Sequence, residues 1–166
     1  MAETATLTLA KALKLKNRMA GRIARLDEDL KNYNSVLAGS DRPDVARIYE
    51  ERRALVAMLV ELKTAINAAN HSVQRVIYEL GEFKSLTAIL SGLNVKHGTV
   101  VEGYSGTQAQ YVAGFKKWDV DRMVRQLETE IDRRQDQLDE FNHRTIISLD
   151  AAMIAAIEAV PPNSGA

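Results

Sequence analysis

The chain has 166 residues with 22 basic and 22 acidic side chains, so its formal net charge is zero and its charge balance indicates no particular partner. Cysteine is absent, which excludes disulfides, thiolate nucleophiles and cysteine-based zinc sites within this chain. Apolar residues make up 46% and aromatic residues only 5%, a composition that favours leucine, isoleucine and alanine packing between helices over a β-sandwich core.

Two long amphipathic helices are predicted in the first half of the chain. Apolar residues recur at alternating steps of three and four from near Thr8 to about Leu37, and again from a start at Asp41–Asp44 to Ala69. The short Gly/Pro/Asp connection between them predicts an antiparallel, coiled-coil-like helical hairpin. Its expected assembly seam, which continues into the last long helix, comprises Ile23, Leu26, Leu30, Leu55, Leu59, Leu62, Leu127, Ile131 and Leu138.

The second half of the chain predicts an arm between two further helices. A third helix is expected from about Gly81 to Leu93, and the last long helix from Asp119 or Asp121 to Asn142. The glycine-punctuated segment 98–118 has β-type content and is expected to be an extended arm or small β-hairpin that reaches a neighbour. The fold class is therefore predicted as all-α, a helical bundle with a short arm. We expect one domain over 1–149, followed by a short C-terminal helix and a flexible tail over 150–166.

Asparagine recurs where the helical pattern weakens. A leucine or isoleucine stands four positions before each of Asn34, Asn70, Asn94 and Asn142. Because asparagine tolerates the left-handed conformation, we interpret these four residues as helix stops. Histidine follows at two of them, in "INAANHSVQ" and "LDEFNHRTI", where the helix dipole would favour an imidazolium.

A metal site built from His71, His97 and His143 is the alternative reading of these histidines. Three histidines suffice in principle for zinc or iron, but no HxxxH or HxxE spacing holds two ligands on one helix face. The sequence also contains no phosphate-binding glycine loop, GxSxG elbow or HExxH motif. We therefore predict a non-enzymatic protein without a cofactor.

A basic face is predicted on the first helix. Lysine and arginine advance by steps of three and four, roughly 110° around the helix from the apolar seam, at Lys11, Lys14, Arg18, Arg22 and Arg25. Such a face can bind nucleic acid or anionic lipid. However, residues 119–142 carry eight acids against four arginines, so contact with that helix, with its copy in another subunit, or with solvent is favoured over nucleic acid.

The chain resembles the septicolysin-like family of bacterial helical proteins. The resemblance covers most of residues 7–146 and rests on "LAKALKLKNRM", the helix stop at Asn34, "LVELKTAINAAN" and "LETEIDRRQDQLDEFN". His143 departs from it by standing where the family tends to have tryptophan, and 74–98 lacks an Arg-Asp pair associated with the family's middle segment. The resemblance implies a helical, self-associating protein of unknown function without accepted catalytic residues.

These observations predict a structural protein that assembles with itself. Long amphipathic helices with few aromatics leave apolar surface that a monomer covers poorly. The first residues lack the pattern of a signal peptide and no stretch is apolar enough for a transmembrane helix, so a cytoplasmic protein or an assembled particle, cellular or phage, is expected. Two alternatives stay open: binding to nucleic acid or anionic surfaces through the basic face, and a metal-dependent protein.

Overall fold

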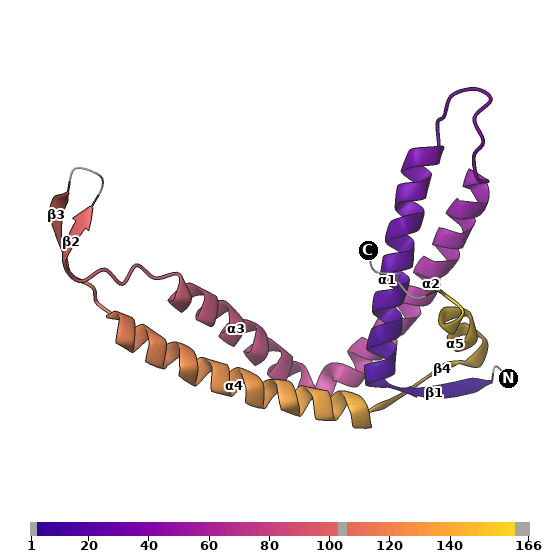
Figure 1. The fold of residues 1–166 in the computed structure, drawn as a ribbon. Coiled ribbons are helices and arrows are strands. Elements are labelled where there is room, and N and C mark those ends of the chain that lie inside the picture. The colour runs from indigo at the N-terminus through magenta and orange to yellow at the C-terminus, as the bar shows by residue number, and fades with distance from the viewer. Residues whose placement is uncertain (1–2, 103–105, 162–166) are drawn as a thin grey trace. The chain divides into compact units, whose positions relative to one another are not determined.

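The computed structural model describes residues 3–102 and 106–161, and over these residues the chain is mostly helical (Figure 1). It divides into two compact units, each described here by itself. Unit 1 comprises Met1–Ser72 and Glu140–Ala166, and unit 2 comprises Val73–Asp139. None of the helices in the described parts of the chain combines the length and apolar content needed to cross a bilayer.

Unit 1 is built from a pair of long helices, a strand pair and a short helix. α1 and α2 lie side by side and are joined by residues 34–44 (Figure 1). Its elements are β1 Thr4–Thr8, α1 Leu9–Tyr33, α2 Val45–Ala69, the 3-10 turn η1 Asn70–Val73, β4 Ile146–Asp150 and α5 Ala151–Glu158.

The strand pair joins segments from the two ends of the chain. β1 and β4 are antiparallel, from Thr4 opposite Asp150 to Thr8 opposite Ile146. Their apolar residues alternate with polar ones, so Leu7 and the Ile147 opposite it are both buried on the same face. That face packs onto a single apolar core formed by Leu7, Leu9, Ala12, Leu15, Met19, Leu26, Leu55, Leu59, Leu62, Ile66, Ile147, Ile154, Ile157 and Val160.

Side-chain caps fix the starts of the unit 1 helices. Thr8, Asp44 and Asp150 each accept a hydrogen bond from the backbone N–H three residues later, at 3.2, 3.1 and 3.0 Å. In the loop between α1 and α2, Gly39 has φ +86°, a conformation that suits glycine. The first helix thus begins near Thr8 as expected, and the second begins within the expected Asp41–Asp44 segment, with Asp44 as its cap.

Unit 2 contains two helices with a β-hairpin between them in sequence. Its elements are α3 Gln74–Ser91, β2 Gly98–Glu102, β3 Thr107–Tyr111 and α4 Lys117–Arg144, of which the last turn belongs to unit 1. The strands β2 and β3 pair antiparallel, from Gly98 opposite Tyr111 to Glu102 opposite Thr107. The glycine-punctuated segment therefore forms a β-hairpin, although Gly103 lies outside the described residues.

The structure departs from the sequence-based expectation in two places. α3 begins at Gln74 rather than near Gly81, so Gly81 is an interior helix residue rather than a boundary. The β1–β4 pair was not expected, because each strand is only five residues long and its partner lies at the opposite end of the chain. The helical class is confirmed, with two small antiparallel strand pairs added to it.

Candidate interaction surface

The two units bury apolar side chains to very different degrees. The core of unit 1 contains the fully buried Met19, Leu62 and Ile157. In the described part of unit 2, by contrast, the buried apolar side chains are Val73, Leu80, Leu90 and Val120. Unit 2 consequently exposes a larger share of its apolar side chains to solvent than unit 1 does.

The seam of α4 is covered on one side only. Its apolar residues follow a heptad spacing at Val120, Val124, Leu127, Ile131 and Leu138. All of them except Val120 are only half-buried. A pair of helices covers one flank of each seam, whereas a bundle of three or four covers both. The heptad positions of α4 are therefore incompletely shielded from water within this chain.

An apolar groove follows the junction of the two helices. It is lined by Leu86 and Leu90 of α3 and by Met123, Gln126, Leu127 and Glu130 of α4. Leu90 also lines a second hollow together with Val120 and Val124. Shape and composition thus leave room for apolar side chains from another molecule beside this junction.

One face of α3 carries exposed residues at helical spacing, and we call it the α3 stripe. By the 100° step per residue it lies roughly 120° around the helix from the side that faces α4. Its exposed fractions reach 65% at Tyr78, 44% at Leu86, 60% at Ile89 and 39% at Leu93. Its members are Tyr78, Glu82, Leu86 and Ile89 of α3, and Leu93, which lies two residues beyond the end of the helix. Spacing alone did not separate this stripe from the side that faces α4, because the apolar residues expected in this helix include members of both; a second set of apolar residues at three-four spacing was the available signal.

An ion pair joins α3 to α4 across the seam. Arg134, which occupies a seam position of α4, places Nε 2.8 Å from Oε2 of Glu79, whose other oxygen accepts from Arg75 at 2.7 Å. The hydrogen bond from Arg75, followed by the nearby charges of Arg134 and Arg75, holds the pKa of Glu79 below its usual value. The positive charge of this seam residue is thereby balanced within the chain, although its Nε lies outside hydrogen-bond geometry.

The hairpin, which we call the arm, is stabilised by a polar cluster. Glu102 receives hydrogen bonds from the ammonium of Lys96 and, at 2.7 Å, from the hydroxyl of Tyr111. The hydrogen bond from Lys96 is the larger cause that lowers the pKa of Glu102, and the carboxylate in turn raises the pKa of both Lys96 and Tyr111. Lys96 also lies 5.1 Å from the centroid of the Tyr111 ring.

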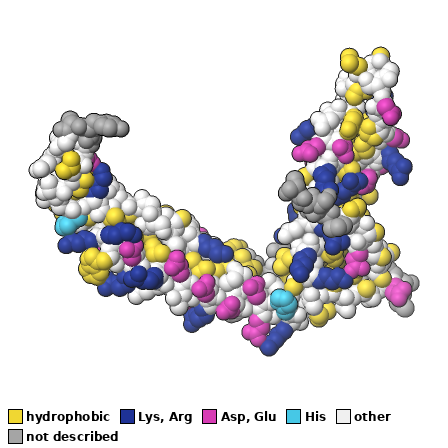
Figure 2. All heavy atoms as spheres, viewed as in Figure 1, with side chains coloured by type: hydrophobic (Ala, Val, Ile, Leu, Met, Phe, Trp, Pro, Cys, Tyr) yellow, Lys and Arg dark blue, Asp and Glu magenta, His cyan; other side chains and the backbone are white. Residues whose placement is uncertain are grey.

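Apolar and basic side chains meet where the arm joins α4. Val112, Phe115 and Trp118 are exposed by 86, 56 and 59%, and the guanidinium of Arg122 lies 5.0 Å from the Trp118 ring centroid. Figure 2 shows hydrophobic and Lys or Arg side chains next to one another over this end of α4. The "FKKW" segment thus presents aromatic residues and lysines together, but no contact in the structure selects a ligand for them.

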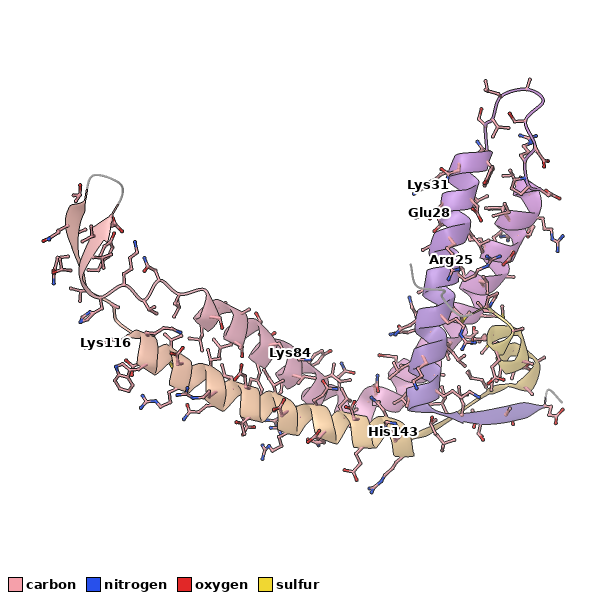
Figure 3. The ribbon with its side chains drawn as sticks, in the orientation of Figure 1. Arg25, Glu28, Lys31, Lys84, Lys116 and His143 are labelled. Atoms are coloured by element: carbon pink, nitrogen blue, oxygen red, sulfur yellow. The ribbon has the colours of Figure 1, made fainter. Side chains whose placement is uncertain are left out.

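Three residues of the basic face of α1 bind acceptor groups within unit 1. Lys11 pairs with Glu158, and Arg18 donates to the carbonyl oxygens of Glu158 at 3.3 Å and of Val160 at 3.4 Å. Arg22 donates twice to Glu51 of α2, at 2.9 and 2.7 Å. The partners of these three residues therefore come from α2 and the C-terminal segment. They do not come from residues 119–142, which were among the contacts expected from the sequence. Lys14 is exposed, and Arg25 lies further along α1 (Figure 3).

The three histidines occupy separate positions. His71 is exposed in η1, His97 accepts a hydrogen bond at Nδ1 from the N–H of Ala113 at 3.3 Å, and His143 is in the last turn of α4 (Figure 3). Across residues 3–102 and 106–161, no group of three or more histidine, aspartate or glutamate side chains could hold a metal ion. The described structure provides no geometry for the metal hypothesis.

Two of the four predicted asparagine stops cap a helix. Asn34 and Asn70 are the C-caps of α1 and α2, but both have right-handed backbone angles, and no described residue other than glycine has positive φ. Asn94 follows the C-cap Gly92, and its Oδ1 accepts from the N–H of Lys96 at 3.1 Å. Asn142 is not a stop, because α4 continues to Arg144. The left-handed explanation is therefore wrong for these asparagines.

The predicted assembly seam divides between the two units. In unit 1, Leu26, Leu55, Leu59 and Leu62 belong to the core, Ile23 packs against it, and Leu30 is half-buried. In unit 2, the three remaining seam residues, Leu127, Ile131 and Leu138, are half-buried.

Comparisons with protein-family models, with curated proteins and with solved structures found no match to this chain. The interaction surface is therefore defined by the chain's own geometry, and the resemblance to septicolysin-like proteins stays a prediction.

Proposed function

We propose that this chain is a non-enzymatic structural protein that assembles with copies of itself, and that α3 and α4 form the contact between subunits. In the assembly, coiled-coil-like packing continues from one chain to the next. Both a cellular homo-oligomer and a component of a phage particle are compatible with this role.

The single observation that carries the proposal is the half-covered helix pair of unit 2. Leu86, Ile89 and Leu93 are exposed, and Leu86 also lines the groove together with Met123 and Leu127. Moving the exposed part of such a side chain out of water contributes roughly 1 kcal/mol, so several together offset much of the cost of association. A solvent-facing helix outside an assembly carries polar residues at such positions.

The basic face gives less support to the nucleic-acid alternative. Arg22 is committed to Glu51 and Lys11 to Glu158, so a phosphate backbone would have to displace carboxylates already in place. No observed contact favours a metal-dependent activity over assembly.

The proposal is tested by Ile89→Asp, read by sedimentation velocity over a concentration series. Ile89 is 60% exposed, so the aspartate leaves the fold of the single chain intact but places a charge on the contact. We expect the wild-type chain to sediment as an oligomer and Ile89→Asp to shift to the monomer. Val60→Asp, at a similar exposure of 53% in α2 of unit 1, is the matched control and should sediment like wild type. A monomeric wild-type chain, or equal behaviour of the two variants, contradicts the proposal.

A further inference from the structure

We propose that the α3 stripe pairs with the α3 stripe of a second copy in antiparallel orientation, about a two-fold axis that passes between Leu86 and Ile89. This inference rests on the proposed self-assembly and specifies its geometry. A two-fold contact requires one surface to be complementary to itself, and the stripe can meet that condition with the second copy running in either direction.

The charge on the stripe decides the direction. Glu82 is its one charged member, is exposed, and has no ion pair or hydrogen bond to a side chain among the residues described. Parallel pairing in register would place Glu82 against Glu82 of the copy, and like charges at a contact oppose association. In antiparallel pairing the two carboxylates lie eleven residues apart along the helix axis, which is roughly 16 Å at the α-helical rise. This separation exceeds the Debye length at physiological salt.

The same orientation matches apolar with apolar and acid with base. Leu86 meets Ile89 of the copy, and the Glu82 end of one stripe meets the Leu93 end of the other. Lys96 follows shortly after Leu93, and its ammonium has three donors, so it can serve Glu82 of the copy as well as its own Glu102. A second copy thus brings a cation toward Glu82, which has no ion pair among the described residues of its own chain.

Leu86 connects the stripe to the apolar groove. It belongs to the stripe and also lines the groove with Met123 and Leu127 of α4. The α3 helix of a second copy, packed on the stripe, therefore lies against the open side of the α3–α4 junction. The α3–α4 pairs of the two copies together form a four-helix arrangement.

The absence of cysteine makes disulfide trapping a clean test. Glu82→Cys and Leu93→Cys are prepared as full-length single-cysteine proteins, oxidised separately and as an equimolar mixture, and analysed by non-reducing electrophoresis. Because a disulfide requires Cα atoms within about 7 Å, antiparallel pairing allows the bond only between the two different variants. We expect the mixture to give several-fold more crosslinked dimer than either protein alone. Lys84→Cys on α3 (Figure 3) is the control and should not crosslink. By the 100° step per residue, position 84 lies roughly 160° around the helix from the stripe.

The outcomes separate this inference from the proposed function. Strong crosslinking of each variant alone indicates parallel pairing and overturns the antiparallel inference, while assembly through α3 still stands. An oligomeric chain whose stripe cysteines do not crosslink in any combination also overturns it. If light scattering shows the wild-type chain and both variants to be monomers, the proposed function fails first and the inference fails with it.

Discussion

Replacement of Ile157 by alanine tests whether the C-terminal helix is part of the core of unit 1. Ile157 lies in α5, has 0% exposure, and belongs to the same core as Met19 and Leu62. Its complete burial is worth about 1.5–3 kcal/mol in transfer free energy, and the space left by the missing carbons adds to the loss. We therefore expect Ile157→Ala to lower the free energy of unfolding by roughly 3 kcal/mol, measured by urea denaturation followed by far-UV circular dichroism.

Ile146→Ala is the matched control, because it removes the same atoms from the neighbouring strand β4. The Ile146 side chain is 56% exposed, so the loss should stay below about 1 kcal/mol. Fluorescence of the lone tryptophan, Trp118, gives a second readout from unit 2. Equal losses for the two isoleucines, or a loss under about 1 kcal/mol for Ile157→Ala, would refute the assignment of α5 to the core.

Three further variants test local features of both units. The hydrogen bond from Lys96 keeps the pKa of Glu102 below its usual value, so this carboxylate stabilises the arm above its unfolded-state pKa and stops doing so as the pH falls through its folded-state pKa. Glu102→Gln should therefore speed amide exchange in the arm at neutral pH and remove the acid dependence of that exchange, both measured by NMR. Glu128→Gln should change neither the exchange rate at neutral pH nor its acid dependence. Asp150→Ala should lower the free energy of unfolding by about 1 kcal/mol in urea denaturation, because it removes the cap of α5. Asp150→Asn should keep most of the stability, since asparagine also caps helices; equal losses for the two variants would contradict the capping role. Gly81→Ala should raise the free energy of unfolding of unit 2 by roughly 0.5–1 kcal/mol and so raise its thermal midpoint, because Gly81 is inside α3 and an added Cβ meets no atom within 4 Å. A lowered midpoint would contradict the helical assignment there.

The long helices could be predicted because local signals agree with tertiary packing. Three-four spacing predicted α1, α2 and α4, and the starts expected near Thr8 and within Asp41–Asp44 agree with the observed caps. Arg134 interrupted the apolar pattern of α4 without ending the helix, since Glu79 satisfies its charge across the seam. Where residues a few positions apart determine an element, the sequence was sufficient.

The features that escaped prediction depend on contacts between distant residues. The β1–β4 pair brings Leu7 beside Ile147, and each strand has only five residues, too few for alternation alone to identify a strand. The partners of Lys11 and Arg22 are single glutamates in α5 and α2, which composition could not select from many acids. The α3 stripe was hidden for a related reason, because burial rather than spacing distinguishes it from the face toward α4.

The mass of the wild-type chain in solution, measured by size-exclusion chromatography with light scattering, tests self-assembly through unit 2 most directly. The chain mass is 18.4 kDa, and we predict a particle with an integer multiple of that mass, two or more, that persists as the protein is diluted toward micromolar concentration. A homogeneous species of 18.4 kDa over the whole concentration range would contradict the account, because the exposed leucine and isoleucine side chains of α3 would then have no partner of the same chain.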